Sequence, residues 1–157
     1  MNIAEVYRQI EADEGKRLVV YLDTEGNPTA GIGHELTQEE ISEYPVGSAI
    51  TPDQCESWYQ ADVAAAITGC EQAPSIPFYG QPDAVQDSLV NMCFNMGPER
   101  LSGFTDFLAY IGEHNYAAAA ADLLNNTLWA KQLPARASRI AAAIGSAAAS
   151  INLKGGV

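Results

Sequence analysis

The sequence is poor in positive charge and in long apolar runs, and each shortage excludes a class of protein. Only 8 residues are Lys or Arg, against 20 Asp or Glu, so the formal net charge is −12. Nucleic-acid binding depends on basic side chains that neutralise phosphates, so we expect no nucleic-acid partner. No stretch approaches the ~18 consecutive apolar residues of a membrane span. The N-terminus also lacks the basic segment and apolar run of a signal peptide, which predicts a protein made in the cytoplasm.

Cysteine is also scarce, and its number and spacing argue against a disulfide framework. The three cysteines are Cys55, Cys70 and Cys93, and an odd count does not favour a set of bridges. Cys55 and Cys70 fall on one predicted helix, which puts them roughly 22 Å apart at ~1.5 Å per residue. The spacing fits no zinc site. We therefore expect buried or half-buried thiols in a reducing compartment, with no metal and no cofactor.

A small β-hairpin is predicted close to the N-terminus, after a short helix. Apolar residues recur on one face over residues 2–12, and Gly15 suits the left-handed position that often ends a helix. β-branched and apolar residues predict a strand over 17–22. Gly, Asn and Pro predict a turn over 23–28, and residues 29–33 can return as a second strand, with one more short strand allowed.

The remainder of the chain has helical periodicity. Helices are expected over residues 39–43, 52–70, 83–96, 104–111, 115–125 and 134–150, with a loop over 74–82 and a tail over 153–157. This pattern predicts an α+β protein with a small lobe over about 13–51 and a connecting helix over 52–71. A larger helical lobe would span 72–157, with helix 2–12 packed on it.

Two carboxylates flank the hairpin in positions suited to the hydrolysis of a glycosidic bond. Such hydrolysis commonly uses two carboxyl groups, one neutral to donate a proton and the other ionised. Glu14 stands where the first helix ends, and Asp23 stands where the first strand enters the turn. Thr29 is expected across the hairpin from Asp23, where its hydroxyl can orient a water. An acidic pair nine residues apart is also common on ordinary surfaces, so the pair alone leaves both interpretations open.

A longer pattern surrounds these residues and continues along the chain. Residues 14–34 combine Glu-Gly, Arg-Leu, Tyr, Asp-Thr-Glu-Gly, Thr and Gly-Ile-Gly-His in this order. Asn-Met-Cys-Phe-Asn-Met-Gly follows at 91–97 and Gly-Phe-Thr at 103–105. The last group comprises Trp129, Gln132, Pro134, Arg136 and Arg139. In motifs and spacing the chain resembles the phage-type lysozymes of glycoside hydrolase family 24, over nearly its whole length.

The resemblance implies a mostly helical lysozyme-like fold with a cleft between the lobes. It also implies an endolysin muramidase that hydrolyses the β-1,4 bond between N-acetylmuramic acid and N-acetylglucosamine in bacterial peptidoglycan. Glu14 would be the general acid, and Asp23 with Thr29 would position or activate water in an inverting reaction. The enzyme would be a monomer and would reach the wall from the host cytoplasm through a separate holin. A lytic transglycosylase and a non-catalytic wall-binding relative are the alternatives.

Further residues are assigned to substrate binding. Phe94 offers an apolar wall for a sugar face, with core packing as the alternative, and Asn95 can bond an N-acetyl group. Gly33 and Leu36 complete this predicted set. Trp58 and Trp129 are expected to anchor cores rather than to carry sugars.

Three supporting residues complete the predicted site. Arg136 is expected to approach Glu14 and hold it in place, and an exposed helix arginine is the alternative. His34 could be taken for a base, but a structural histidine paired with Asp62 is the favoured interpretation.

Overall fold

The computed structural model describes residues 1–73 and 76–152, in two compact units. Unit 1 comprises Met1–Val6 and Ala66–Val157, and unit 2 comprises Tyr7–Ala65. Helices predominate, and a small antiparallel sheet lies in unit 2, which confirms the predicted α+β fold class. The predicted tail over 153–157 and residues 74–75 of the predicted loop lie outside the described residues.

The first helix, α1, covers Ile3–Glu14 and extends two residues beyond its predicted end. Gly15 has a φ of +73°, and its N–H donates to the Glu11 carbonyl at 2.9 Å. This left-handed residue ends the helix in the expected way, because glycine adopts positive φ without a Cβ penalty. Glu14 is therefore the last residue of a regular helix.

The sheet of unit 2 holds β1 (Arg17–Leu22), β2 (Pro28–Gly31) and β3 (His34–Glu35), in the order β1-β2-β3. The second strand ends two residues earlier than predicted. Gly31 and Gly33 take φ values of +63° and +69°, which turn the chain away from β2 and into β3. These glycines end the strand because an L side chain rarely tolerates such angles.

Two helices complete unit 2 or begin in it. In α2 (Gln38–Glu43), the Thr37 hydroxyl and the Glu40 carboxylate form a reciprocal capping box. The longer α3 (Pro52–Glu71) starts where the Thr51 hydroxyl accepts the N–H of Gln54, and it continues into unit 1. The apolar core of unit 2 includes Ile10, Val20, Ala30, Ile32, Ile50, Trp58, Tyr59 and Val63. The expectation that Trp58 anchors a core is confirmed.

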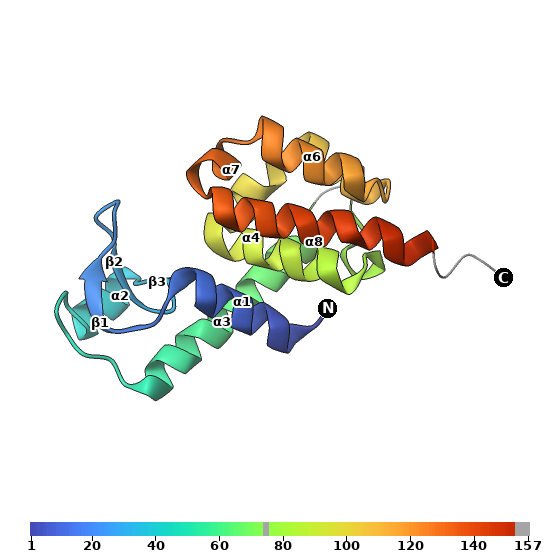
Figure 1. Cartoon of the computed structure of the whole chain (residues 1–157). Helices are drawn as coiled ribbons and strands as arrows, with labels where there is room; N and C mark the ends of the chain where they lie inside the picture. Colours follow the sequence, from blue (N-terminus) through green and yellow to red (C-terminus); the bar gives the residue numbers. More distant parts are fainter. Residues whose placement is uncertain (74–75, 153–157) are drawn as a thin grey trace. The chain divides into compact units, whose positions relative to one another are not determined.

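Unit 1 is built from helices that pack around α8 (Pro134–Asn152), which contacts α4 (Asp83–Ser102), α6 (Tyr116–Asn126) and α7 (Leu128–Gln132). Figure 1 shows α8 lying beside α4 and α6. The short α5 (Thr105–Gly112) packs on α6, and a 3-10 turn, η1, covers Phe78–Gly80. The largest buried side chains of unit 1 are Leu89, Met92, Leu101, Phe107, Leu108, Ile111, Tyr116, Leu123, Ile140 and Ile144.

The helices of unit 1 contain the break expected after residue 96 and two helical segments that were not expected. Gly97 leaves the helical region with φ +79° and ψ 161°, and a further helical segment begins at Pro98 and continues to Ser102. Proline is favoured at a first helical position, which explains why the helix resumes directly after the break. Helix α7 was not predicted at all, although the Thr127 hydroxyl caps it by accepting the Ala130 N–H.

None of the helices among residues 1–73 and 76–152 combines the length and the hydropathy of a membrane span.

Candidate functional site

In the hairpin turn of unit 2, Asp23 and Thr29 are both hydrogen-bonded to the backbone of Asn27. Asp23 donates its backbone N–H to the Asn27 carbonyl at 3.0 Å, and its Oδ1 accepts the N–H groups of Glu25 and Asn27, both at 2.8 Å. The Thr29 hydroxyl donates to the same Asn27 carbonyl at 3.1 Å. Backbone bonds of this kind hold a side chain in one rotamer, so both groups are preorganised.

The register corrects the expected position of Thr29. It pairs with Tyr21 on β1 and with Glu35 on β3, whereas the residue facing Asp23 in the turn is Asn27. The expectation that Thr29 lies directly across the hairpin from Asp23 is therefore wrong by two residues. The error came from taking the whole of 23–28 as turn, while Pro28 already belongs to β2.

Glu14 lies against the turn that follows the C-terminal end of β2. A Cβ atom added at Gly33 would lie 3.3 Å from Glu14 Cγ and 3.3 Å from Glu14 Oε2. A Cβ at Gly31 would lie 3.2 Å from the Sγ atom of Cys55 on α3. The Gly-Ile-Gly motif thus lets the backbone contact both helices, and it brings the half-buried Glu14 carboxylate into the same unit as Asp23.

His34 is held by two carboxylates. Its Nδ1 is 2.8 Å from Asp62 Oδ2, its Nε2 is 3.2 Å from Glu40 Oε2, and its ring stacks on Trp58 at 4.5 Å. Burial by itself would lower the pKa of His34, but hydrogen bonds and charge from Asp62 and Glu40 raise that pKa on balance. The pairing with Asp62 expected from the sequence is present, and Glu40 is a second partner that the sequence analysis missed.

Leu36 and Gly33, both assigned to substrate binding from the sequence, lie in different surroundings. Leu36 is 5% exposed and belongs to the core of unit 2, with its backbone N–H donating to the Pro28 carbonyl at 2.9 Å. Gly33 is exposed and contacts Glu14. Of the two, Gly33 alone is exposed, and it lies beside the Glu14 carboxylate.

Arg136, on α8 in unit 1, is buried and not an exposed helix arginine. Its Nε donates to Asn91 Oδ1 at 2.8 Å, and its side chain also donates to the Asn91 carbonyl oxygen at 3.2 Å. Arg136 is 7% exposed and Asn91 is fully buried. The exposed alternative is therefore wrong, while the expected approach of Arg136 to Glu14 joins residues of different units and stays a prediction.

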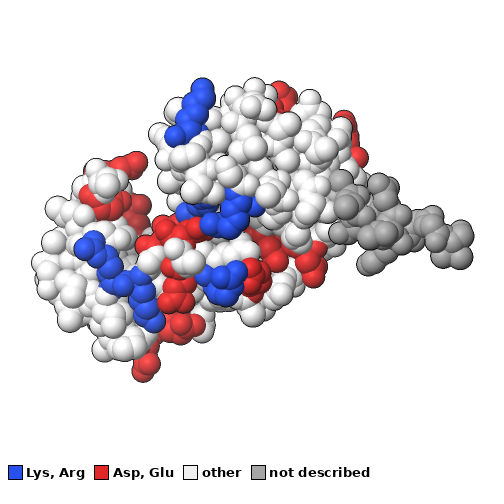
Figure 2. Space-filling model, in the orientation of Figure 1, with Lys and Arg blue, Asp and Glu red and all other residues white. Residues whose placement is uncertain are grey.

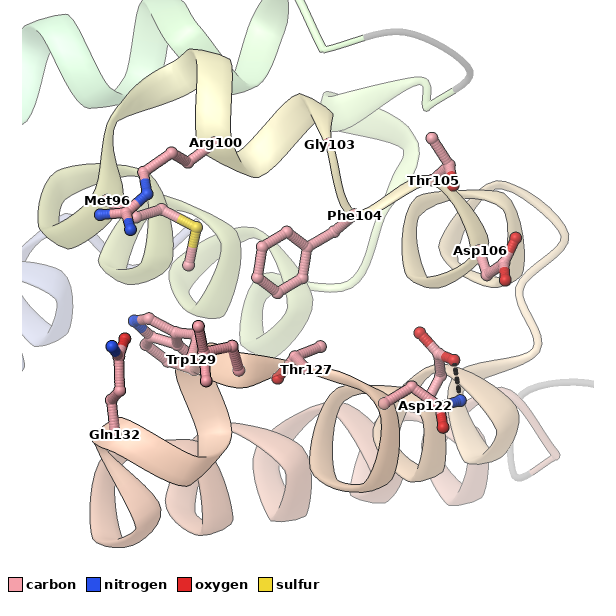
Figure 3. A pocket seen from close by; sticks show the side chains of 12 residues that line it. Met96, Arg100, Gly103, Phe104, Thr105, Asp106, Asp122, Thr127, Trp129 and Gln132 are labelled. Carbon is pink, nitrogen blue, oxygen red and sulfur yellow. Dashed lines mark hydrogen bonds between the residues drawn. The ribbon is translucent and has the colours of Figure 1, made fainter.

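A pocket of about 400 Å³ opens within unit 1 (Figure 3). Phe104, Trp129 and Met96 give it an apolar lining. Asp106 and Asp122 lie at one end and Arg100 and Gln132 at the other, as Figure 3 shows. Phe104 and Gln132 belong to motifs that are visible in the sequence, but the cavity itself is not predictable from them, because it forms between α4, α5, α6 and α7 only after folding.

Trp129 links this pocket to the predicted substrate-binding pair on α4. It is 7% exposed, and its indole N–H donates to Asn95 Oδ1 at 2.8 Å. Asn95 is exposed and Phe94 half-buried. Trp129 is thus buried as expected, but it also lines the pocket, and it fixes the direction of the Asn95 amide.

Acidic residues gather in one stretch of the sequence in unit 2. All are exposed or half-buried: Glu35, Glu39, Glu40, Glu43, Asp53, Glu56 and Asp62. Figure 2 shows acidic and basic side chains intermixed on the face that it draws. Within the described ranges, no three His, Cys, Asp or Glu side chains are grouped as metal ligands would be.

Comparison with known proteins identifies the family. The phage lysozyme family matches residues 11–141, which include the hairpin, α3 and most of unit 1. The chain is 33% identical to probable T4-type lysozyme 2 of Dictyostelium discoideum over 83% of this chain and 88% of that protein. It is 30% identical to the pre-baseplate central spike protein Gp5 of Enterobacteria phage T4, over 89% of this chain and 27% of that protein. The endolysin of Salmonella phage P22 is 28% identical over 78% of this chain and 79% of that protein. The chain therefore belongs to the phage lysozyme family, and with it to the lysozyme class of enzymes.

Proposed function

We propose that this lysozyme is an inverting muramidase that hydrolyses the β-1,4 bond between N-acetylmuramic acid and N-acetylglucosamine in bacterial peptidoglycan. The observation that carries the proposal is the hairpin of unit 2. It fixes Asp23 and Thr29 to the Asn27 backbone and brings its Gly33 end against Glu14. Glycosidases of this kind need two carboxyl groups held on one framework, and this unit supplies them.

Glu14 is the general acid in this proposal. It ends a regular helix, and its carboxyl group lies against backbone at Gly33, so its position is set by α1 and by the turn before β3. A proton passes from Glu14 to the glycosidic oxygen as the bond to the anomeric carbon breaks. Glu14 becomes a carboxylate, and the released sugar leaves with a hydroxyl group.

Asp23 and Thr29 orient the attacking water in this proposal, and Asp23 takes up its proton. The Thr29 hydroxyl donates its hydrogen to the Asn27 carbonyl, so toward a water its oxygen acts as an acceptor. Both turn hydrogen bonds fall on Oδ1 of Asp23, so its other oxygen can accept from the attacking water. Two acceptors orient both hydrogens of one water and direct its lone pair at the anomeric carbon. The water's proton goes to Asp23, and attack opposite the leaving group inverts the configuration.

Unit 1 offers groups that we assign to glycan binding. The Trp129 N–H donates to Asn95 Oδ1 and fixes the orientation of this amide, which we assign to an N-acetyl group of the glycan. The pocket beside Trp129 and Phe104 offers an apolar floor to a sugar face and polar groups at both ends.

Analysis of digested peptidoglycan by mass spectrometry separates this function from the alternatives. Hydrolysis yields reducing muramic acid ends, a lytic transglycosylase yields 1,6-anhydro ends, and a wall-binding protein yields no products. Glu14→Gln should abolish clearing of permeabilised Gram-negative cells while the folded protein keeps its circular dichroism spectrum. Undiminished clearing by that variant would remove Glu14 from the mechanism.

The biological setting follows from the same proposal. The enzyme acts as a monomeric endolysin in host lysis, is made in the host cytoplasm and reaches the wall through a separately encoded holin. Expression in bacteria with and without a co-expressed holin tests this. Lysis should require both proteins, and lysis by the enzyme alone would show another route to the wall.

A further inference from the structure

Glu35 stands directly beside Thr29 in the sheet of unit 2. The two residues are opposite partners in the pairing of β3 with β2. The N–H of Leu36 donates to the Pro28 carbonyl at 2.9 Å, which makes Pro28 and Leu36 a hydrogen-bonded pair. Pair types alternate along an antiparallel ladder, so Thr29 and Glu35 form the non-hydrogen-bonded kind, in which the side chains lie closest. Their Cβ atoms are therefore about 5 Å apart.

The face of the sheet that carries Glu35 also carries Asp23. Residues paired across antiparallel strands project to one face, and the faces alternate along each strand. Thr29 pairs with Tyr21 on β1, and Asp23 lies two residues further along and keeps this register through its backbone bond across the turn. Glu35, Thr29 and Asp23 therefore project from one face. Ala30, the next residue of β2, lies on the opposite face and is fully buried.

The Glu35 carboxylate is available to a ligand. Glu35 is exposed, and within residues 1–73 and 76–152 its side chain has no hydrogen bond or ion pair. The guanidinium of Arg17 on β1 lies over the ring of Tyr21, 4.2 Å from its centroid. Strand β2 separates Tyr21 from Glu35, which amounts to two strand spacings of about 4.8 Å each. Arg17 is thus paired with an aromatic ring and leaves the Glu35 charge in place.

We propose that Glu35 is a specificity-determining residue, whose carboxylate binds the free amino group of a glycan unit that has lost its N-acetyl group. This inference rests on the proposed function, since the glycan lies over this face only if Asp23 and Thr29 orient the attacking water. A carboxylate accepts charge-assisted hydrogen bonds from an ammonium group, and these are stronger than bonds between neutral groups. An acetamido group offers one neutral N–H instead. Of two otherwise equal glycans, the enzyme therefore prefers the one with free amino groups.

The charge of unit 2 favours the same substrate. Residues 7–65 contain twelve Asp or Glu side chains and three Lys or Arg. Such a surface attracts a cationic polymer and repels an anionic one, and salt weakens both effects. This contribution is general, whereas that of Glu35 depends on one position beside Thr29. Glu39, another exposed carboxylate of the unit, lies in the first turn of α2 and serves to separate the two contributions.

The test compares two samples of the same peptidoglycan, one treated with a peptidoglycan N-deacetylase and the other mock-treated. The release of reducing ends gives kcat/KM on both samples, and the ratio of treated to mock-treated measures the preference. We expect this ratio to be roughly 3- to 5-fold higher in the wild type than in Glu35→Gln, which is the size of an exposed ion pair. Glutamine keeps the shape and one acceptor oxygen but removes the charge. Added salt should lower the wild-type ratio toward that of Glu35→Gln.

Glu39→Gln is the matched control, and its ratio should equal that of the wild type. Equal ratios in the wild type and Glu35→Gln would overturn the proposal. An equal drop in both variants would also overturn it, because the preference would then come from the general charge of unit 2.

A wild type that releases no reducing ends from either sample would contradict the proposed function instead. In that event, the wild type and Glu35→Gln are titrated with a fully deacetylated glucosamine tetramer and followed by NMR at residues 28–36. Shifts in the wild type alone would support Glu35 as the amine-binding group. Identical responses in the two proteins would overturn that role.

Discussion

Glu14 fills the space that a side chain at Gly33 would need. A Cβ atom at Gly33 would lie 3.3 Å from Glu14 Oε2 and 3.4 Å from Glu14 Cβ, and Gly33 itself has a φ of +69°. The end of α1 and the turn before β3 are therefore in van der Waals contact, and no further atom fits between them. The position of Glu14, the proposed general acid, therefore depends on residue 33 being a glycine.

Gly33→Ala should impair the enzyme more than it impairs folding. The new methyl group pushes the Glu14 carboxylate by a few tenths of an ångström. A displacement of about 1 Å costs roughly 100-fold in rate, so we expect a several-fold loss of activity. The positive φ adds about 1–2 kcal/mol of strain to the folded state. Gly47→Ala is the matched control, since Gly47 has a φ of +94° with nothing within 4 Å of its Cβ position. Steady-state clearing assays and urea unfolding of both variants measure the two effects. Equal activity in both variants would contradict the role given to the Glu14 contact.

Asp23 has a structural role that can be separated from its proposed catalytic one. Its Oδ1 accepts two backbone N–H groups of the turn, and an asparagine keeps that oxygen. Asp23→Asn should therefore lose on the order of 100-fold or more in kcat, with nearly unchanged stability. Asp23→Ala also removes the turn acceptor and should lower the free energy of unfolding by about 1–2 kcal/mol. If Asp23→Asn retained full kcat, the water-handling role of the carboxylate would be wrong.

Local signals accounted for the parts of unit 2 that the sequence predicted correctly. Gly15 ends α1, residues 17–22 form β1, and Thr51 caps α3, because each depends on neighbours within a few residues. The capping box of Thr37 and Glu40 is equally local but was not among the predictions, and neither was Glu40 as the second partner of His34.

Contacts between distant segments could not be predicted in the same way. The pairing of Arg136 with Asn91, the close approach of Cys93 to Gly69 and the pocket at Trp129 depend on how α3 to α8 pack against one another. Helical periodicity shows which face of a helix is buried, but not which residues of two helices meet. The break at Gly97 was predicted, but the helical segment that resumes at Pro98 was not, since only tertiary packing decides whether a helix resumes after Gly-Pro.

The imidazolium of His34 should stabilise unit 2 in acid and lose its effect in base. Its pKa is raised in the folded state, so its contribution is fully present below the unfolded value of about 6.5. It then declines as the pH rises through the folded pKa. Asp62→Asn should move the NMR titration of His34 to lower pH, and Glu40→Gln should do so less. The stability difference between wild type and Asp62→Asn should shrink as the pH rises. A difference that grows with pH would reverse the sign of this argument.

Arg136 and Asn91 form a buried pair whose loss should cost stability, and the same residues test the predicted link to Glu14. Arg136→Met leaves Asn91 Oδ1 without its Nε donor in a fully buried position, which should cost about 1–3 kcal/mol. Asn91→Ala is the matched control, because it breaks the same bond and keeps the guanidinium. If Arg136 also holds Glu14, then kcat and the upper limb of the pH–rate profile should change in Arg136→Met and much less in Asn91→Ala, both measured below their melting temperatures. Identical profiles in the two variants would limit Arg136 to packing α8 against α4.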